Sequence, residues 1–126
     1  MRLAFQRLVF ALLFYALACS CATSPYQSRT LTLTPANDIA VRTGVIRATS
    51  IPLGPSRGTV SMNAPDGESF FGTYAPLVTP SQKSWEIILT GDEGTEMRCG
   101  YQVDSEKGRG TGECKLSTGA IYDLSF

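Results

Sequence analysis

Hydrophobic and polar residues alternate along much of the chain after Thr30, and glycine or proline interrupts the pattern at short intervals. A period of two is typical of strands with one buried face, and no window there holds a 3.6-residue apolar period long enough to predict a helix. Near the start of this region Leu31 and Leu33 alternate with threonines, which predicts a strand closed by Pro35.

Later segments extend this pattern to the end of the sequence. A second strand is expected over 41–49, and clustered proline and glycine predict a loop over 50–57. Further strands are expected around Trp85 to Leu89 and from Ile121 to Phe126, each next to a glycine-containing turn. We therefore expect one all-β domain over 30–126 built of antiparallel hairpins, either a small sheet, a partly open barrel or a sandwich.

The N-terminal segment has a different pattern. Arg2 and Arg7 supply positive charge, an uncharged apolar run follows over 8–18, and small residues with Cys19 and Cys21 come next. Basic, apolar and small residues in this order are typical of a secretory signal peptide. As a helix the apolar run would be about 16 Å long, roughly half of a bilayer's hydrocarbon core.

Because the apolar run ends in cysteines, the segment resembles the signal of a bacterial lipoprotein, which is cut before a cysteine that then carries acyl chains. Small residues before Cys21 favour lipidation there, and Ala18 before Cys19 leaves Cys19 as the alternative. The resemblance implies a signal helix over 1–20. It also implies anchoring in the outer membrane, because Ala22 or Ser20 stands where an aspartate would favour retention in the inner membrane.

The residues after the lipid site are small and polar and include a proline, which predicts a flexible tether over 21–29. The full chain has 11 basic and 11 acidic residues, and loss of Arg2 and Arg7 leaves 9 against 11. Without a basic run, binding to nucleic acid is not expected. The expected partners are the membrane, through acyl chains, and an envelope protein of unknown identity.

Two cysteines in the C-terminal half suggest a strand pairing. If Cys99 lies opposite Cys114 in an antiparallel hairpin, apolar side chains of both strands share one face and polar side chains share the other. A slip by one residue would mix the two faces. The apolar face would carry Met97, Cys99, Tyr101, Val103, Cys114 and Leu116. In an exported domain this pair is expected to form a structural disulfide rather than a redox or metal site.

Candidate chemistry is sparse. The chain has no histidine, so a Ser-His-Asp or Cys-His nucleophile is excluded, and we expect no catalytic, cofactor-binding or metal-binding residues. The acidic side chains of Asp92, Glu93 and Glu96 are interpreted as turn charges because the spacing of a calcium loop is missing. Four aromatic residues at strand spacing are interpreted as core rather than as the lining of a ligand groove. They are Phe70, Phe71, Tyr74 and Trp85.

Segments 67–74, 89–99 and 110–123 are similar to small proteobacterial lipoproteins of uncharacterised function, a resemblance that implies a β domain with a disulfide. The sequence therefore predicts a lipid-anchored envelope protein with a structural, binding or accessory role. Enzymatic activity is not expected. An alternative comes from 118–122, which resembles the Ser-Gly-x-x-Tyr motif of periplasmic lysozyme inhibitors with threonine in place of serine. Their second motif, Tyr followed by Thr-Lys-Gly, is missing from this sequence.

Overall fold

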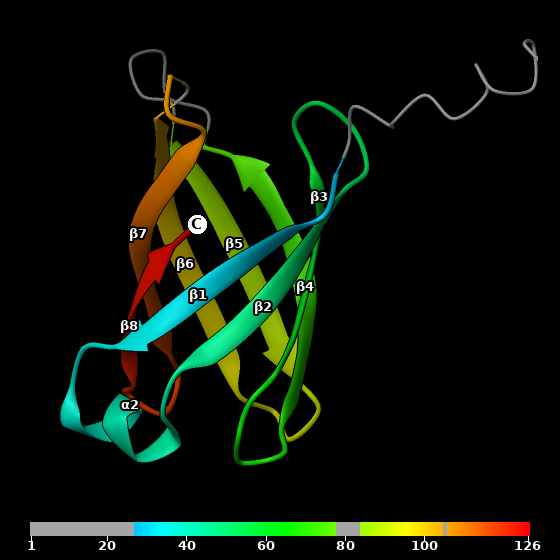
Figure 1. Ribbon diagram of the computed structural model, residues 1–126. Helices are drawn as coiled ribbons and strands as arrows, with labels where there is room; N and C mark the ends of the chain where they lie inside the picture. Colours follow the sequence, from blue (N-terminus) through cyan, green and yellow to red (C-terminus); the bar gives the residue numbers. More distant parts are fainter. Residues whose placement is uncertain (1–26, 78–83, 105) are drawn as a thin grey trace, which may run out of the picture.

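The computed structural model describes residues 27–77, 84–104 and 106–126, which form a closed antiparallel barrel of eight strands (Figure 1). Each strand pairs with the next in sequence, and the last closes against the first. The strands are β1 (Arg29–Pro35), β2 (Ile46–Pro52), β3 (Gly58–Asn63), β4 (Ser69–Pro76), β5 (Ser84–Gly91), β6 (Glu96–Asp104), β7 (Arg109–Leu116) and β8 (Ile121–Ser125). The all-β prediction is confirmed, and the barrel is closed rather than open.

Alternation along each strand separates the inside of the barrel from the outside. In β6, for example, Met97 and Cys99 are buried whereas Arg98 and Gly100 are exposed. Eight strands enclose a space that inward side chains can just fill. The core therefore lies inside the barrel, and all eight strands are contained within 29–125.

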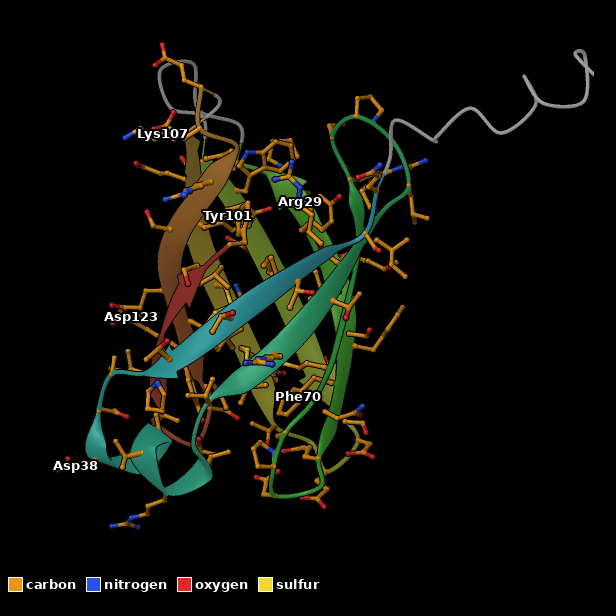
Figure 2. All side chains as sticks on the ribbon, viewed as in Figure 1. Arg29, Asp38, Phe70, Tyr101, Lys107 and Asp123 are labelled. Atoms are coloured by element: carbon orange, nitrogen blue, oxygen red, sulfur yellow. A yellow bond between two sulfur atoms is a disulfide. The ribbon has the colours of Figure 1, made fainter. Side chains whose placement is uncertain are left out.

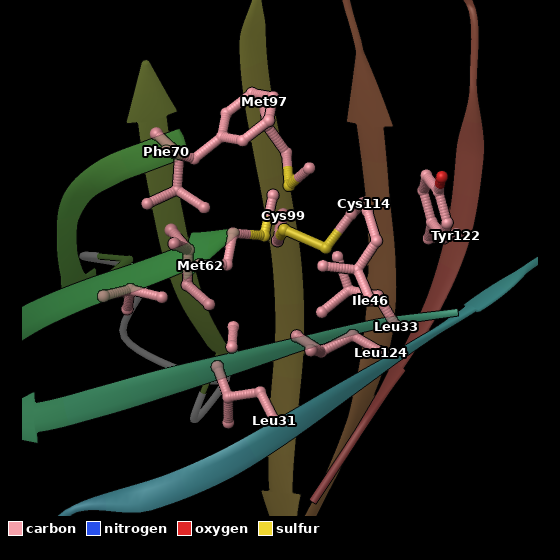
Figure 3. Close-up of a cluster of buried hydrophobic side chains, with 14 of the residues drawn as sticks. Leu31, Leu33, Ile46, Met62, Phe70, Met97, Cys99, Cys114, Tyr122 and Leu124 are labelled. Atoms are coloured by element: carbon pink, nitrogen blue, oxygen red, sulfur yellow. A yellow bond between two sulfur atoms is a disulfide. The ribbon is translucent and has the colours of Figure 1, made fainter. Parts of the chain in front are cut away.

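The predicted pairing of β6 with β7 is confirmed. Cys99 lies opposite Cys114, and Tyr101 lies opposite Gly112, as the sorting of apolar side chains requires. The two cysteines form a disulfide with their Cα atoms 4.0 Å apart. Figure 3 shows this bond crossing between neighbouring strands inside the barrel, among the apolar side chains of the core.

The strand expected over 41–49 is wrong in its first part, because a short helix, α2 (Asp38–Thr43), occupies the connection between β1 and β2. The side chain of Asn37 accepts a hydrogen bond from the amide of Ala40 at 3.0 Å, which caps the helix start. Gly44, at φ 86°, ends the helix in a conformation that favours glycine. Strand β2 begins only at Ile46 and runs to Pro52, so it also takes up the first part of the expected loop.

Helix α2 closes one end of the barrel (Figure 1). The buried phenol of Tyr122 donates a hydrogen bond to the carbonyl of Ala40 at 3.4 Å. The side-chain amide of Asn37 donates to the carbonyl of Gly119 at 2.9 Å, which ties the helix start to the β7–β8 turn. These contacts connect the helix to the barrel wall, and the end of the barrel that α2 covers is called the closed end below.

The predicted signal segment 1–20 and the candidate lipidation sites Cys19 and Cys21 lie outside the described residues. Of the predicted tether only 27–29 are described, and Arg29 already belongs to β1. Within the described part of the chain, no helix is long and apolar enough to cross a bilayer.

Candidate functional site

A cavity of about 550 Å³ opens at the end of the barrel opposite α2. Its walls come from β1 to β6 and from the last residue of the chain. Aromatic side chains form one side of the entrance, and aliphatic side chains lie deeper. The aromatic residues are Tyr74, Trp85, Tyr101 and Phe126.

The strand repeat places the lining in two layers. Leu31 follows Arg29 by two residues on β1, and Ile87 follows Trp85 by two residues on β5. Residues two apart share a face and are about 6.5 Å apart along the strand. Leu31, Val60 and Ile87 are at most 4% exposed and form the inner layer. The cavity thus has an aliphatic floor beneath an aromatic and charged entrance.

The four aromatic rings form a continuous wall. The ring centroids of Tyr74 and Trp85 are 6.1 Å apart in an edge-on arrangement, and those of Trp85 and Tyr101 are 6.3 Å apart and stacked. Tyr101 then meets Phe126 edge-on at 5.6 Å. Pairs at these separations stabilise one another by about 0.5–1.5 kcal/mol beyond simple burial, so the wall is a preformed surface.

Glycines in the neighbouring strands make room for these rings. A Cβ atom at Gly58 would collide with the ring of Tyr74, and one at Gly112 would collide with the backbone and Cβ of Tyr101. The absence of side chains at these inward positions lets the rings lie flat against the sheet. The glycines of β3 and β7 therefore help to shape the cavity.

Arg29 brings a positive charge to the entrance. Figure 2 shows Arg29 and Tyr101 at the same end of the barrel, away from Asp38 of α2. The guanidinium of Arg29 lies 5.7 Å from the centroid of the Phe126 ring, a cation–π distance. One of its nitrogens donates to the carbonyl of Gly108 at 3.5 Å. The single ion pair in the described part of the chain joins Lys115 to Glu113, so no described carboxylate neutralises Arg29.

The tyrosine hydroxyls supply neutral polar groups. Burial raises the pKa of Tyr101, the nearby Tyr74 raises it further, and the positive charge of Arg29 partly lowers it. Burial also raises the pKa of Tyr74, again with an opposing effect of Arg29. Both phenols therefore keep their protons at neutral pH and can donate hydrogen bonds to a ligand.

The structure separates the four aromatic residues that the sequence grouped as core. Phe70 is 3% exposed and belongs to the core, whereas Phe71 is 62% exposed on the outer face of β4, so the interpretation of Phe71 as core was wrong. Tyr74 and Trp85 are partly buried and pack against the core, but they also line the cavity, a role that the sequence interpretation did not assign to them. The reason is position along the strand, because both lie near the open end.

Sequence reasoning missed Arg29, Phe126 and the cavity role of Tyr101. The register of β6 and β7 already put Tyr101 on the inner face, and Phe126 continues the alternation of Tyr122 and Leu124. Arg29 carried no comparable signal and fell in the predicted tether. In the structure β1 begins at Arg29, earlier than the predicted strand, and this places its side chain at the cavity.

The acidic residues around the β5–β6 turn lie at the closed end. One carboxylate oxygen of Asp92 accepts a hydrogen bond from the amide of Ser69 at 3.0 Å, so this side chain joins two turns. The side chains of Glu93 and Glu96 are exposed. In 27–77, 84–104 and 106–126, no three His, Cys, Asp or Glu side chains are grouped so that they could hold a metal ion.

The motif at 118–122 also lies at the closed end. Thr118 and Gly119 form the exposed β7–β8 turn, whereas Tyr122 is fully buried inside the barrel. The hydroxyl of Thr118 accepts a hydrogen bond from the amide of Ala120 at 3.4 Å, which serves the turn itself. In this conformation only the turn, and not the tyrosine, is accessible to a protein partner.

No protein family, curated protein or solved structure matches this chain. The resemblances to lipoproteins and to lysozyme inhibitors therefore stay predictions from the sequence. What the cavity binds has to be inferred from its own residues.

Proposed function

We propose that the chain is a lipid-anchored protein of the bacterial envelope, held in the outer membrane by acyl chains on Cys21 or Cys19, and that its barrel binds a small amphipathic ligand. The cavity of about 550 Å³ is the observation that carries the binding role. Its size falls within the range of roughly 300–1,000 Å³ that is typical of small-molecule sites. The rest of the barrel interior is filled by core side chains.

The residue types in the lining favour binding over catalysis. None of the described lining residues carries a carboxylate, a thiol or an imidazole, the side chains that most often transfer protons near neutral pH. The polar groups present are a guanidinium, an amide, two hydroxyls, two phenols and an indole N–H, from Arg29, Gln27, Ser28, Ser50, Tyr74, Tyr101 and Trp85. These groups orient a ligand through hydrogen bonds and charge.

The ligand is expected to have an apolar body and one negatively charged group. Apolar atoms fit the floor and the aromatic wall, because they remove both from water. An anionic group fits Arg29, which has no described ion-pair partner and can form two parallel hydrogen bonds with a carboxylate or phosphate.

Fluorescence of Trp85 tests this proposal directly because the chain has a single tryptophan. Residues 27–126, which contain the whole closed barrel, would be titrated with anilinonaphthalene sulfonate, an aromatic anion. We expect saturable binding that weakens by about tenfold in Arg29→Gln, since a charge-assisted hydrogen bond is lost. Arg98→Gln, on the exposed face of β6, is the matched control and should bind like the unmodified protein. A non-saturable response, or equal affinity in both variants, would contradict the proposal.

The anchor needs a separate test. Intact mass and palmitate labelling of the full chain made in a Gram-negative host should show a mature protein that starts at Cys21 and carries acyl chains. Cys21→Ala should abolish labelling, or shift it to Cys19, whereas Cys99→Ala should leave it unchanged. Recovery of an unlabelled protein with no added lipid mass would contradict the anchored state while leaving the cavity proposal intact.

A further inference from the structure

The start of the barrel chain lies at the cavity itself. Gln27 and Ser28, which precede β1, are part of the cavity lining. Gln27 is six positions after Cys21 and eight positions after Cys19. At roughly 3.5 Å per extended residue these segments span no more than about 21 or 28 Å. If the lipid anchor of the proposed function is present, it keeps the cavity entrance close to the bilayer surface.

The rim of the entrance is suited to that position. Three large apolar side chains at this end are exposed to water, Ile51 by 48%, Leu53 by 64% and Leu77 by 42%, and three others, Ile39, Val41 and Val45, are exposed on and beside α2 at the other end. The first three come from the end of β2, the β2–β3 loop and the residue after β4. Apolar side chains at the entrance are compatible with contact between this end and a membrane surface, and the position of the anchor decides between the two ends.

The charged residues also favour an entrance that faces the membrane. The ends of the described strands and loops at the entrance carry the basic residues Arg29, Arg57, Lys107 and Arg109 beside the acidic residues Asp104 and Glu106. At the closed end, the turns carry mainly acidic residues, among them Asp38, Asp66, Asp92 and Glu93. An anionic membrane surface would attract the entrance and repel the closed end.

We infer that the cavity takes up one long-chain fatty acid from the adjoining membrane, with the tail on Leu31, Val60 and Ile87 and the carboxylate on Arg29. The order of groups along the barrel axis carries this inference. The aliphatic floor is innermost, and the aromatic wall and the guanidinium of Arg29 share the entrance. A fatty acid has the same order, from apolar tail to anionic head. The anchor's own acyl chains are uncharged where they join the protein, so they would leave Arg29 without a partner.

A titration series separates the tail from the head group. Trp85 fluorescence would be followed while fatty acids of increasing chain length are added to residues 27–126, below the concentrations at which they aggregate. Burial of each CH₂ contributes about 0.8 kcal/mol, so each added CH₂ should tighten binding by about threefold to fourfold until the cavity is full. Dibromostearate, whose bromine atoms quench a nearby indole, should quench Trp85 at saturation.

The head group is tested by comparing decanoate with decanol in Arg29→Gln and in the control Arg98→Gln. Decanoate should bind about tenfold more weakly to Arg29→Gln than to Arg98→Gln, whereas decanol should bind equally to both. Val60→Phe should fill part of the aliphatic floor, so affinity should stop rising at a shorter fatty-acid length than in the unmodified protein. If this variant does not fold, the Arg29 comparison still decides the proposal.

Each other outcome has a defined meaning. Binding of anilinonaphthalene sulfonate without saturable binding of any fatty acid would overturn the fatty-acid inference and leave the proposed binding function standing. Binding of decanoate and decanol with the same affinity, and without an effect of Arg29→Gln, would overturn the assignment of the head group. Failure of all the ligands would overturn the binding function itself.

Discussion

The ring of Phe126 occupies the space in which a side chain at position 110 would have to lie. A Cβ atom at Gly110 would collide with this ring, which is packed against β7 from inside the barrel. The two residues also form a reciprocal pair of backbone hydrogen bonds, each with an N–O distance of 3.1 Å. Gly110 therefore holds the end of the chain in place as one wall of the cavity.

Gly110→Ala is expected to displace the Phe126 ring and to disturb both the barrel and the cavity. Forcing a methyl group into a packed site costs about 1–3 kcal/mol in the free energy of unfolding. Ligand affinity should fall as well, since Phe126 contacts both Tyr101 and Arg29. Denaturant unfolding and the Trp85 titration measure the two effects.

Gly100→Ala is the matched control because nothing lies within 4 Å of a Cβ atom at that position. Gly100 is exposed and belongs to β6, which pairs with β7, the strand that holds Gly110. Its replacement should leave stability and binding nearly unchanged. If the two variants behave alike, the close packing of Phe126 on Gly110 is not important in solution.

Removal of the disulfide should destabilise the barrel without changing its register. Cys99 and Cys114 are 15 residues apart in sequence, and closing a loop of that size contributes about 3 kcal/mol in the loop-entropy description. The double variant Cys99→Ala/Cys114→Ala should melt at a lower temperature, by about 4–8 °C for each kcal/mol lost. Peptide mapping without reduction should recover the two cysteines linked to each other. Free thiols in protein purified without reductant would contradict this pairing.

Glu68 is a buried carboxylate with a structural role at the closed end. It is 4% exposed, and its Oε2 atom accepts hydrogen bonds from the amides of Glu93 at 3.1 Å and Thr95 at 3.3 Å. A Cβ atom at Gly91 would collide with the same carboxylate. The side chain of Glu68 therefore joins the β3–β4 and β5–β6 turns, as that of Asp92 also does.

Glu68→Ala should lower the free energy of unfolding by about 2–4 kcal/mol, because two amide donors lose their acceptor in a buried place. Glu68→Gln keeps an acceptor oxygen and should cost less than Glu68→Ala. Glu96→Ala, at an exposed position on β6, is the control and should change stability by no more than about 0.5 kcal/mol. Equal stability of Glu68→Ala and Glu96→Ala would contradict the role of the buried carboxylate.

The sequence was sufficient to predict most of the strands and one register, because their signal is local. Cys99 and Cys114 and their neighbours sort into two faces in only one register, and the structure has that register. Helix α2 was missed because its six residues are too few to show a helical period. The cap residues Asn37 and Gly44 are its sequence signal.

The cavity could not be predicted in the same way, because it depends on closure of the barrel. Tyr74 and Trp85 follow the same alternation as Phe70, and only their distance from the closed end makes them part of the lining. Barrel closure also brings Arg29 of β1 close to Phe126 at the end of the chain. Contacts between residues so far apart in sequence leave no local pattern.

The tyrosines of the barrel should titrate at unusually high pH. Residues 27–126 contain three, Tyr74, Tyr101 and Tyr122, and burial raises the pKa of each. For Tyr122 a hydrogen bond with Thr43 opposes this rise, and the charge of Asp66 adds to it. Tyrosinate absorbance should therefore appear at higher pH in the folded barrel than in the chain unfolded in denaturant.

The raised pKa values also predict how stability depends on pH. Between the ordinary tyrosine pKa of about 10 and the higher folded value, the folded barrel binds more protons than the unfolded chain. The contribution of these phenols to stability is therefore fully present below about pH 10 and is lost as the pH rises above it. Denaturant unfolding at a series of alkaline pH values should show this fall, and Tyr101→Phe should make it shallower. A barrel whose tyrosines titrate together near pH 10 while still folded would show that water reaches the phenols, and that the aromatic wall is not formed as the structure has it.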